Sequence, residues 1–114
     1  RAAIVRTAAV GPYTGDFTEV VFEAGNVAEG NYLTLTGREI LLMWNTSADT
    51  AYYVTIDSVD DQFGRQEDIT ELDIGFGDIE MFGPINMAGW AQSNGQLYVN
   101  VENAAILLGC IVIP

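Results

Sequence analysis

The chain has 114 residues, with 16 acidic side chains against four arginines and neither lysine nor histidine, so its formal charge at pH 7 is -12. Without histidine and lysine it has no Ser-His-Asp triad, no imidazole metal ligand, no Schiff-base chemistry and no phosphate-binding P-loop. The large negative charge also repels nucleic acid and anionic membranes. Neither is therefore expected as a partner.

Length and composition predict one globular domain. Hydrophobic residues make up 49% of the chain and charged residues 18%, which is typical of a folded protein rather than a disordered one. We expect a single β domain over residues 1–114, with residues 1–12 as an N-terminal arm. No apolar run approaches the roughly 20 residues of a membrane span, and no signal peptide is recognisable, so we expect a soluble protein. The first residue is Arg1 rather than Met, from which we expect proteolytic processing or a preceding segment.

Strand-like segments follow one another along the whole chain. They are rich in β-branched and aromatic residues, and pairs such as Gly11-Pro12 and Gly83-Pro84 separate them every eight to twelve residues. Asn94-Gly95 is the strongest hairpin signal, because both residues tolerate positive φ. The predicted strands are Ile4–Val10, Thr18–Glu23, Tyr32–Leu35, Glu39–Asn45, Tyr52–Asp57, Ile69–Ile74, Ile79–Phe82, Gln96–Val101 and Ala105–Ile113.

Helical patterns are missing from the sequence. No window longer than about ten residues carries an apolar stripe at helical spacing together with caps, and residues 20–29 allow one helical turn at most. Many short strands in a small domain favour an all-β fold. We predict a single-domain antiparallel β-sandwich or jelly-roll-like barrel of eight to nine short strands.

The single cysteine, Cys110, cannot form an intramolecular disulfide. It lies in the apolar run from Ile106 to Ile113, and an activated thiolate would need a cationic neighbour, of which the chain has few. We therefore interpret Cys110 as a buried small hydrophobic residue.

The densest polar segment runs from Asp57 to Asp68. Crowded carboxylates in a loop can coordinate Ca²⁺, but the spacing matches neither an EF-hand loop nor the nonapeptide repeats of calcium-binding β-rolls. A solvated loop is the favoured interpretation, and no cofactor is expected. The weak calcium candidates are Asp57, Asp60, Asp61 and Asp68.

Aromatic residues are the candidates for contacts with a partner. Tyr52 and Tyr53 must point to opposite faces of a strand, so one of the two faces outward. Trp44 lies among Leu42 and Met43 and is expected in the core. The predicted interface residues are Tyr13, Tyr32, Tyr52, Tyr53 and Trp90.

The order of several motifs resembles a group of small structural proteins of tailed-bacteriophage virions. The motifs are Thr36-Gly37-Arg38-Glu39 before a strand, Val54-Thr55-Ile56 running to Phe63-Gly64-Arg65, Phe82-Gly83-Pro84, and Trp90 followed by Asn94-Gly95. The resemblance spans residues 14–113 and rests on turns and strand cores, so it carries over no catalytic residue.

The resemblance implies a non-enzymatic capsid decoration (cement) protein on the outer surface of a phage head. Its partners would be the major capsid protein and further copies of itself, with a trimer favoured, and its location the exterior of the virion. Two alternatives stay open: a carbohydrate- or host-surface-binding module, and a head-tail connector or tail component. An enzyme is the least expected class.

Overall fold

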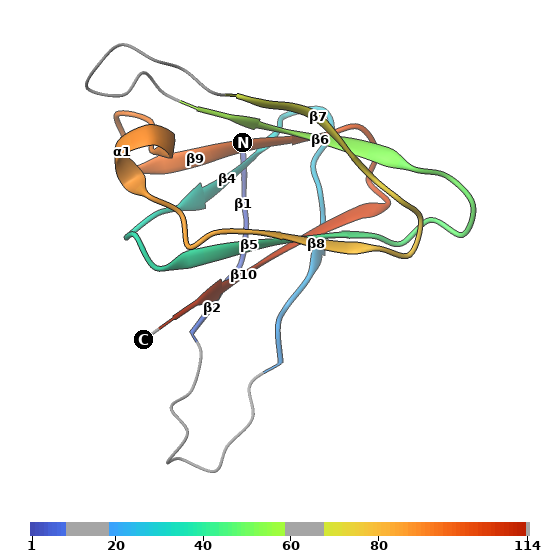
Figure 1. The fold of residues 1–114 in the computed structure, drawn as a ribbon, viewed down its shortest axis with the longest axis horizontal. Coiled ribbons are helices and arrows are strands. Elements are labelled where there is room, and N and C mark those ends of the chain that lie inside the picture. Colours follow the sequence, from blue (N-terminus) through green and yellow to red (C-terminus); the bar gives the residue numbers. More distant parts are fainter. Residues whose placement is uncertain (9–18, 59–67, 114) are drawn as a thin grey trace.

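The computed structural model describes residues 1–8, 19–58 and 68–113, which form two five-stranded sheets packed face to face. Figure 1 shows the two sheets edge on, with β6 and β7 in the upper layer and β5, β8 and β10 in the lower one. Sheet A contains β1 (Ala2–Ala3), β4 (Asn31–Thr34), β9 (Gln96–Val101), β6 (Tyr52–Asp57) and β7 (Ile69–Ile74), in this spatial order. Sheet B contains β2 (Arg6–Ala8), β10 (Ile106–Val112), β5 (Glu39–Asn45) and β8 (Ile79–Phe82), and β3 (Glu23–Ala24) also pairs with β10.

The connections between the strands follow a jelly-roll path. From β3 onward the chain passes to the other sheet at every connection except the one between β6 and β7. The resulting orders, β4-β9-β6-β7 and β3-β10-β5-β8, are those of an eight-stranded jelly roll. The predicted all-β sandwich is therefore confirmed.

The N-terminal segment adds two parallel pairs to this antiparallel framework. β1 pairs with β4 in sheet A, and β2 pairs with β10 in sheet B. Between them Ile4 is only 7% exposed and belongs to the core. The prediction of one strand over Ile4–Val10 missed this sheet change, and the described residues form ten strands rather than the eight or nine predicted. The described part of the predicted arm, residues 1–8, thus pairs with both sheets.

The core lies between the sheets and follows from strand alternation. In β9 every second residue is buried, so Leu97, Val99 and Val101 face inward and their neighbours face outward. β5 and β10 are apolar on both faces instead. The buried hydrophobic cluster consists of Ile4, Leu33, Leu35, Leu41, Met43, Val54, Ile56, Ile74, Ile85, Leu97, Val99, Val101, Ile106, Leu108 and Cys110.

A buried side-chain amide, that of Asn45, joins the end of β5 in sheet B to the end of β7 in sheet A. The Asn45 Nδ2 group donates to the carbonyls of Thr50 and Ile74, at 2.9 and 2.8 Å, and its Oδ1 accepts from the Ser47 amide. In the part of the chain that the structure describes, no buried side-chain nitrogen or oxygen lacks a hydrogen-bond partner. Polar burial therefore costs little here, because each lost water contact is replaced.

A single helical turn, α1 (Met87–Trp90), precedes the Asn94-Gly95 turn. The hairpin signal at Asn94-Gly95 predicts a strand on each side of the turn, but on the N-terminal side Asn86 caps a helical turn instead. The turn itself forms, with Gly95 at a φ of 80° and its amide donating to the Gln92 carbonyl. Within residues 1–8, 19–58 and 68–113 no helix has the length and apolar character needed to span a membrane.

Candidate interaction surfaces

The described parts of the predicted calcium loop are already engaged within the protein. Asp68 Oδ1 accepts hydrogen bonds from the Ser58 amide at 2.7 Å and from its hydroxyl at 2.8 Å, and these bonds lower the pKa of Asp68. Asp57 lies 3.9 Å from the Arg1 guanidinium. Asp60 and Asp61 lie outside the described residues, and among those described no three acidic or sulfur ligands come together.

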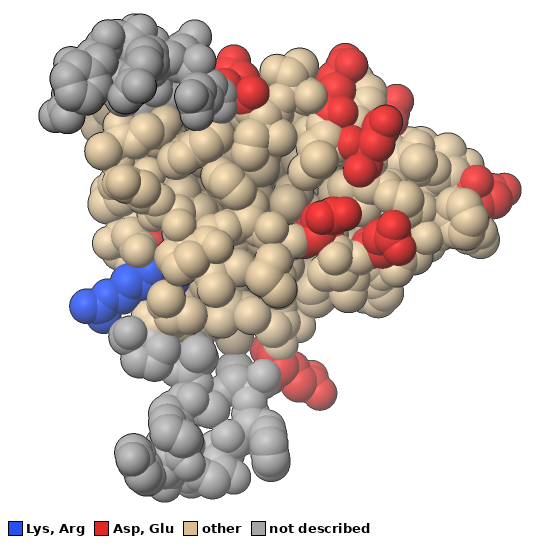
Figure 2. All heavy atoms as spheres, in the orientation of Figure 1, with Lys and Arg blue, Asp and Glu red and all other residues tan. Residues whose placement is uncertain are grey.

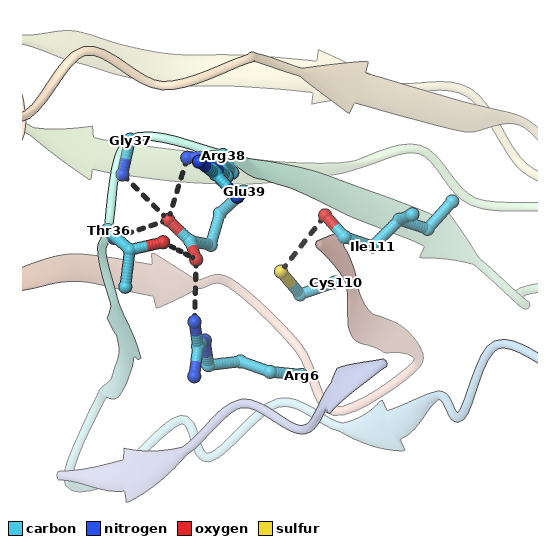
Figure 3. A network of polar contacts seen from close by, with 7 residues as sticks. All are labelled: Arg6, Thr36, Gly37, Arg38, Glu39, Cys110 and Ile111. Carbon is cyan, nitrogen blue, oxygen red and sulfur yellow. Dashed lines mark hydrogen bonds and ion pairs between the residues drawn. The ribbon is translucent and has the colours of Figure 1, made fainter. Parts of the chain in front are cut away.

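The most buried charge in the described residues is Glu39, at 0% exposure (Figure 3). Its Oε2 meets the Arg6 guanidinium and the Thr36 hydroxyl, each at 2.7 Å. Its Oε1 accepts from the backbone amides of Thr36, Gly37 and Arg38. Burial alone would raise the pKa of Glu39, but these hydrogen bonds outweigh it and lower the pKa to about 2. A carboxylate so fully bonded closes the turn before β5 and is not free to accept a proton from a substrate.

Cys110 is buried beside this network, as predicted. Its exposure is 0%, and its Sγ lies 3.6 Å from the carbonyl oxygen of Ile111. Burial first and the Glu39 charge second raise the pKa of the thiol to about 11. The sulfur therefore stays protonated at neutral pH and packs as a small hydrophobic group.

The outer face of sheet A carries polar and aromatic side chains. Tyr32, Tyr98 and Asp57 lie in one row across β4, β9 and β6, because each is the direct neighbour of the next in register. The Arg1 guanidinium lies 4.0 Å from the centre of the Tyr98 ring and 3.1 Å from the Asn100 Oδ1 atom. A cation above an aromatic face and beside a carboxylate fixes this row in place.

The same face becomes acidic toward β7. Tyr53 pairs with Asp73 on β7, and its amide donates to Glu102 at the end of β9. Acidic side chains gather over β7, β8 and the loop between β5 and β6, while basic surface is visible at the opposite side of the molecule (Figure 2). The described acids on these elements, and in the turn before β8, are Asp49, Glu71, Asp73, Asp78 and Glu80.

The predicted interface aromatics do not share one surface. Tyr32 and Tyr53 face outward on sheet A, whereas Tyr52 packs partly against the core. Trp90 also packs on the core, with its ring 4.9 Å from that of Phe82 in an edge-on arrangement. Tyr13 lies outside the described residues. The alternation of Tyr52 and Tyr53 could be read from the strand, but the position of Trp90 depended on α1.

The outer face of sheet B has the opposite character. The outward-facing residues of the adjacent strands β10, β5 and β8 carry no charge. Trp44 is one of these outward-facing residues, although the sequence predicts it in the core. Ile79 and Met81 on the edge strand β8 are 57% and 71% exposed. The apolar face, as we name it here, consists of Ile40, Leu42, Trp44, Ile79, Met81, Leu107 and Ile111.

Part of the apolar face is covered by the segment 20–22, which the sequence predicts as part of a strand but which is irregular in the structure. This segment runs over Gly109, where an added Cβ would lie 3.0 Å from the Val21 carbonyl oxygen and 3.2 Å from the Phe22 ring. Phe22 also packs edge-on against Trp44, with ring centres 5.5 Å apart. Glycine at position 109 thus allows the segment to approach β10, and the β8 side of the face stays open.

No protein-family model matches the chain, and neither a curated protein nor a solved structure matches it. The strand order and the contrast between the two outer faces are therefore the observations on which a functional interpretation depends.

Proposed function

We propose that this protein is a non-enzymatic structural protein of a tailed-phage virion, a decoration protein bound to the outside of the head. The observation that carries the proposal is the jelly-roll strand order, because this architecture is used by viral capsid proteins and by lectins. The motif order from Thr36 to Gly95 supports the virion rather than the lectin interpretation.

The outer face of sheet A is the surface proposed to meet the major capsid protein. It presents Tyr32 and Tyr53, and tyrosine is enriched at the energetic centres of interfaces. Asp73 and Glu102 next to Tyr53 favour a basic partner surface. Binding of this kind weakens with rising salt, since screening reduces attraction between opposite charges.

The test is co-sedimentation with heads of the encoding phage assembled without this protein. Wild-type protein should pellet with the heads at low salt, and Tyr53→Ala should weaken binding by about tenfold or more. Val27→Ala, which alters an exposed turn residue, is the matched control and should bind normally. Wild-type protein that stays in the supernatant at low salt would refute the decoration role.

Glycan binding is the second candidate, favoured by the row of Tyr32 and Tyr98 on a flat sheet face. Sugars stack on aromatic rings, although Arg1 already covers one side of Tyr98. The decoration proposal expects no change in tyrosine fluorescence with soluble glycans. A saturable change that Tyr32→Ala abolishes would favour the glycan interpretation instead.

A head-tail connector or tail component is distinguished by the number of copies. Such components form rings of six or twelve, whereas decoration favours a trimer. Native mass by light scattering therefore separates the two structural roles.

A further inference from the structure

We propose that the apolar face of sheet B is the surface through which copies of this chain bind one another. The inference deepens the proposed function, and it rests on that function only for the expectation of an oligomer. The occupant of the face is a second copy, in a two-fold or three-fold assembly.

The first argument is that the apolar residues of this face have the pattern of a buried surface but are only partly buried within one molecule. Strands β5 and β10 carry apolar residues on both sides, a pattern found where both sides of a sheet are buried. Within the molecule, the segment 20–22 covers the region around Gly109 and Trp44. Ile79 and Met81 remain largely exposed on an edge strand, where proteins ordinarily place charges to prevent association.

The second argument is exposure. Val21, Ile79 and Met81 lie on or beside the apolar face and are 45%, 57% and 71% exposed. Contiguous exposed apolar side chains of this kind mark sites of association.

The third argument is charge. Each chain carries a formal charge of -12, so two copies can approach closely only where no acidic side chain opposes another. On the outer face of sheet A, Asp57, Asp73 and Glu102 would meet their counterparts. The described members of the apolar face carry no charge, and Glu80, between Ile79 and Met81 on β8, is the register neighbour of the core residue Met43 and so lies on the other side of the strand. Two copies that meet through this face therefore place no acidic member of one face against an acidic member of the other.

The charge also predicts the effect of salt. Apolar contacts are nearly independent of salt in this range, whereas the mutual repulsion of two negative chains is screened. Self-association should therefore strengthen as sodium chloride rises. A basic partner protein on the same face would show the opposite dependence.

The experiment is sedimentation velocity with light scattering on the purified chain, from about 10 µM to about 500 µM, at about 50 and about 500 mM NaCl. Wild-type protein should form dimers or trimers, with more oligomer at the higher salt. Met81→Glu should weaken association at least about tenfold. Thr34→Glu adds the same charge on the exposed outer side of β4, in the other sheet, and should leave association near the wild-type level.

Three results would overturn the inference: a monomer at the highest concentration in both salts, equal weakening by Thr34→Glu, or association that salt disrupts. Circular dichroism and urea unfolding establish that each variant is folded, and Met81→Gln repeats the test without a charge. A monomer that still pellets with heads would refute the self-binding face and leave the decoration role intact. An oligomer that Met81→Glu weakens but that does not pellet with heads would support the self-binding face and refute the decoration role.

Discussion

Arg6 and Glu39 form a 2.7 Å ion pair that spans sheet B over β10 and joins its edge strand to the start of β5. Arg6 is the direct register neighbour of Cys110, which itself pairs with Leu41 on β5. The pair therefore connects the N-terminal segment to the centre of the sheet. The Glu39 carboxylate therefore holds β2 in place through Arg6 and accepts the hydrogen bonds of the turn before β5.

Breaking this pair should destabilise the protein. Glu39→Gln keeps the shape but removes the negative charge that pairs with Arg6, and it replaces one of the two accepting carboxylate oxygens by an NH2 donor. We expect a loss of about 2–4 kcal/mol. Arg6→Ala should cost about 1–3 kcal/mol, because the backbone amides still satisfy part of the carboxylate. Urea unfolding at pH 7 measures both.

Arg38→Ala is the matched control for Arg6→Ala. It removes the same charge beside Glu39, but the Arg38 contact to Glu39 is made by its backbone amide, which alanine retains. We expect a change within about 0.5 kcal/mol. If Arg38→Ala costs as much as Arg6→Ala, general electrostatics rather than the specific pair is responsible.

The stability should depend on acid pH through Glu39. Its pKa is about 2 in the folded protein against 4.5 as the ordinary value. Because the folded value is lower, the contribution is fully present above about pH 4.5 and is lost as the pH falls toward 2; it amounts to about 3 kcal/mol. The lowered pKa of Asp68 acts in the same direction.

Chemical denaturation at a series of pH values between 7 and 2 measures this dependence. Wild-type stability should fall steeply below about pH 4.5, whereas Glu39→Gln should be less stable at pH 7 and show a shallower slope. Parallel curves for the two proteins would contradict the assignment to Glu39.

Cys110 should be chemically inert in the folded protein. Its pKa of about 11, against 9.0 ordinarily, lowers the thiolate fraction at pH 8 by about a hundredfold, and burial slows access further. Labelling with a thiol-reactive chromogenic disulfide should therefore be at least about a hundredfold slower in buffer than in concentrated urea. Rapid labelling of native protein would mean that β10 opens readily.

Calcium should leave thermal stability unchanged. The two described candidate ligands already have partners: Asp57 lies beside the Arg1 guanidinium, and Asp68 accepts two hydrogen bonds from Ser58. Melting temperatures with millimolar CaCl₂ and with EDTA should agree within about 1 °C, since a ligand that binds only the native state raises this temperature. A rise of several degrees would restore the calcium interpretation of this loop.

Much of the fold could be read from local patterns. The spans of β5, β6, β7, β8 and β9 coincide with the predicted strands, because alternating or β-branched runs between glycine and proline turns define both. The short elements were harder. β1, β2 and β3 have two or three residues each and depend on pairing partners distant in the chain, and the single turn of α1 depends on the Asn86 cap.

Some features of the candidate surfaces can likewise be predicted from local sequence, and others depend on long-range pairing. The outward position of one of Tyr52 and Tyr53 follows from alternation along a strand. The row of Tyr32, Tyr98 and Asp57 does not follow from alternation. It requires β9 to pair with β4 and with β6, which brings together residues 66 and 41 positions apart in the sequence. The ion pair of Arg6 and Glu39 likewise joins residues 33 positions apart.

The sequence by itself determined the all-β class, the burial of Cys110 in an apolar run and the exclusion of histidine- and lysine-based chemistry, since composition and period-two patterns act locally. Only the tertiary structure decided which apolar side chains form the core and which form an open face. Strand alternation separates two sides but does not say which is inside, and in β5 and β10 both sides are apolar. The packing of sheet A against one side of sheet B made that choice, and it left Ile79, Met81 and their neighbours on the outside.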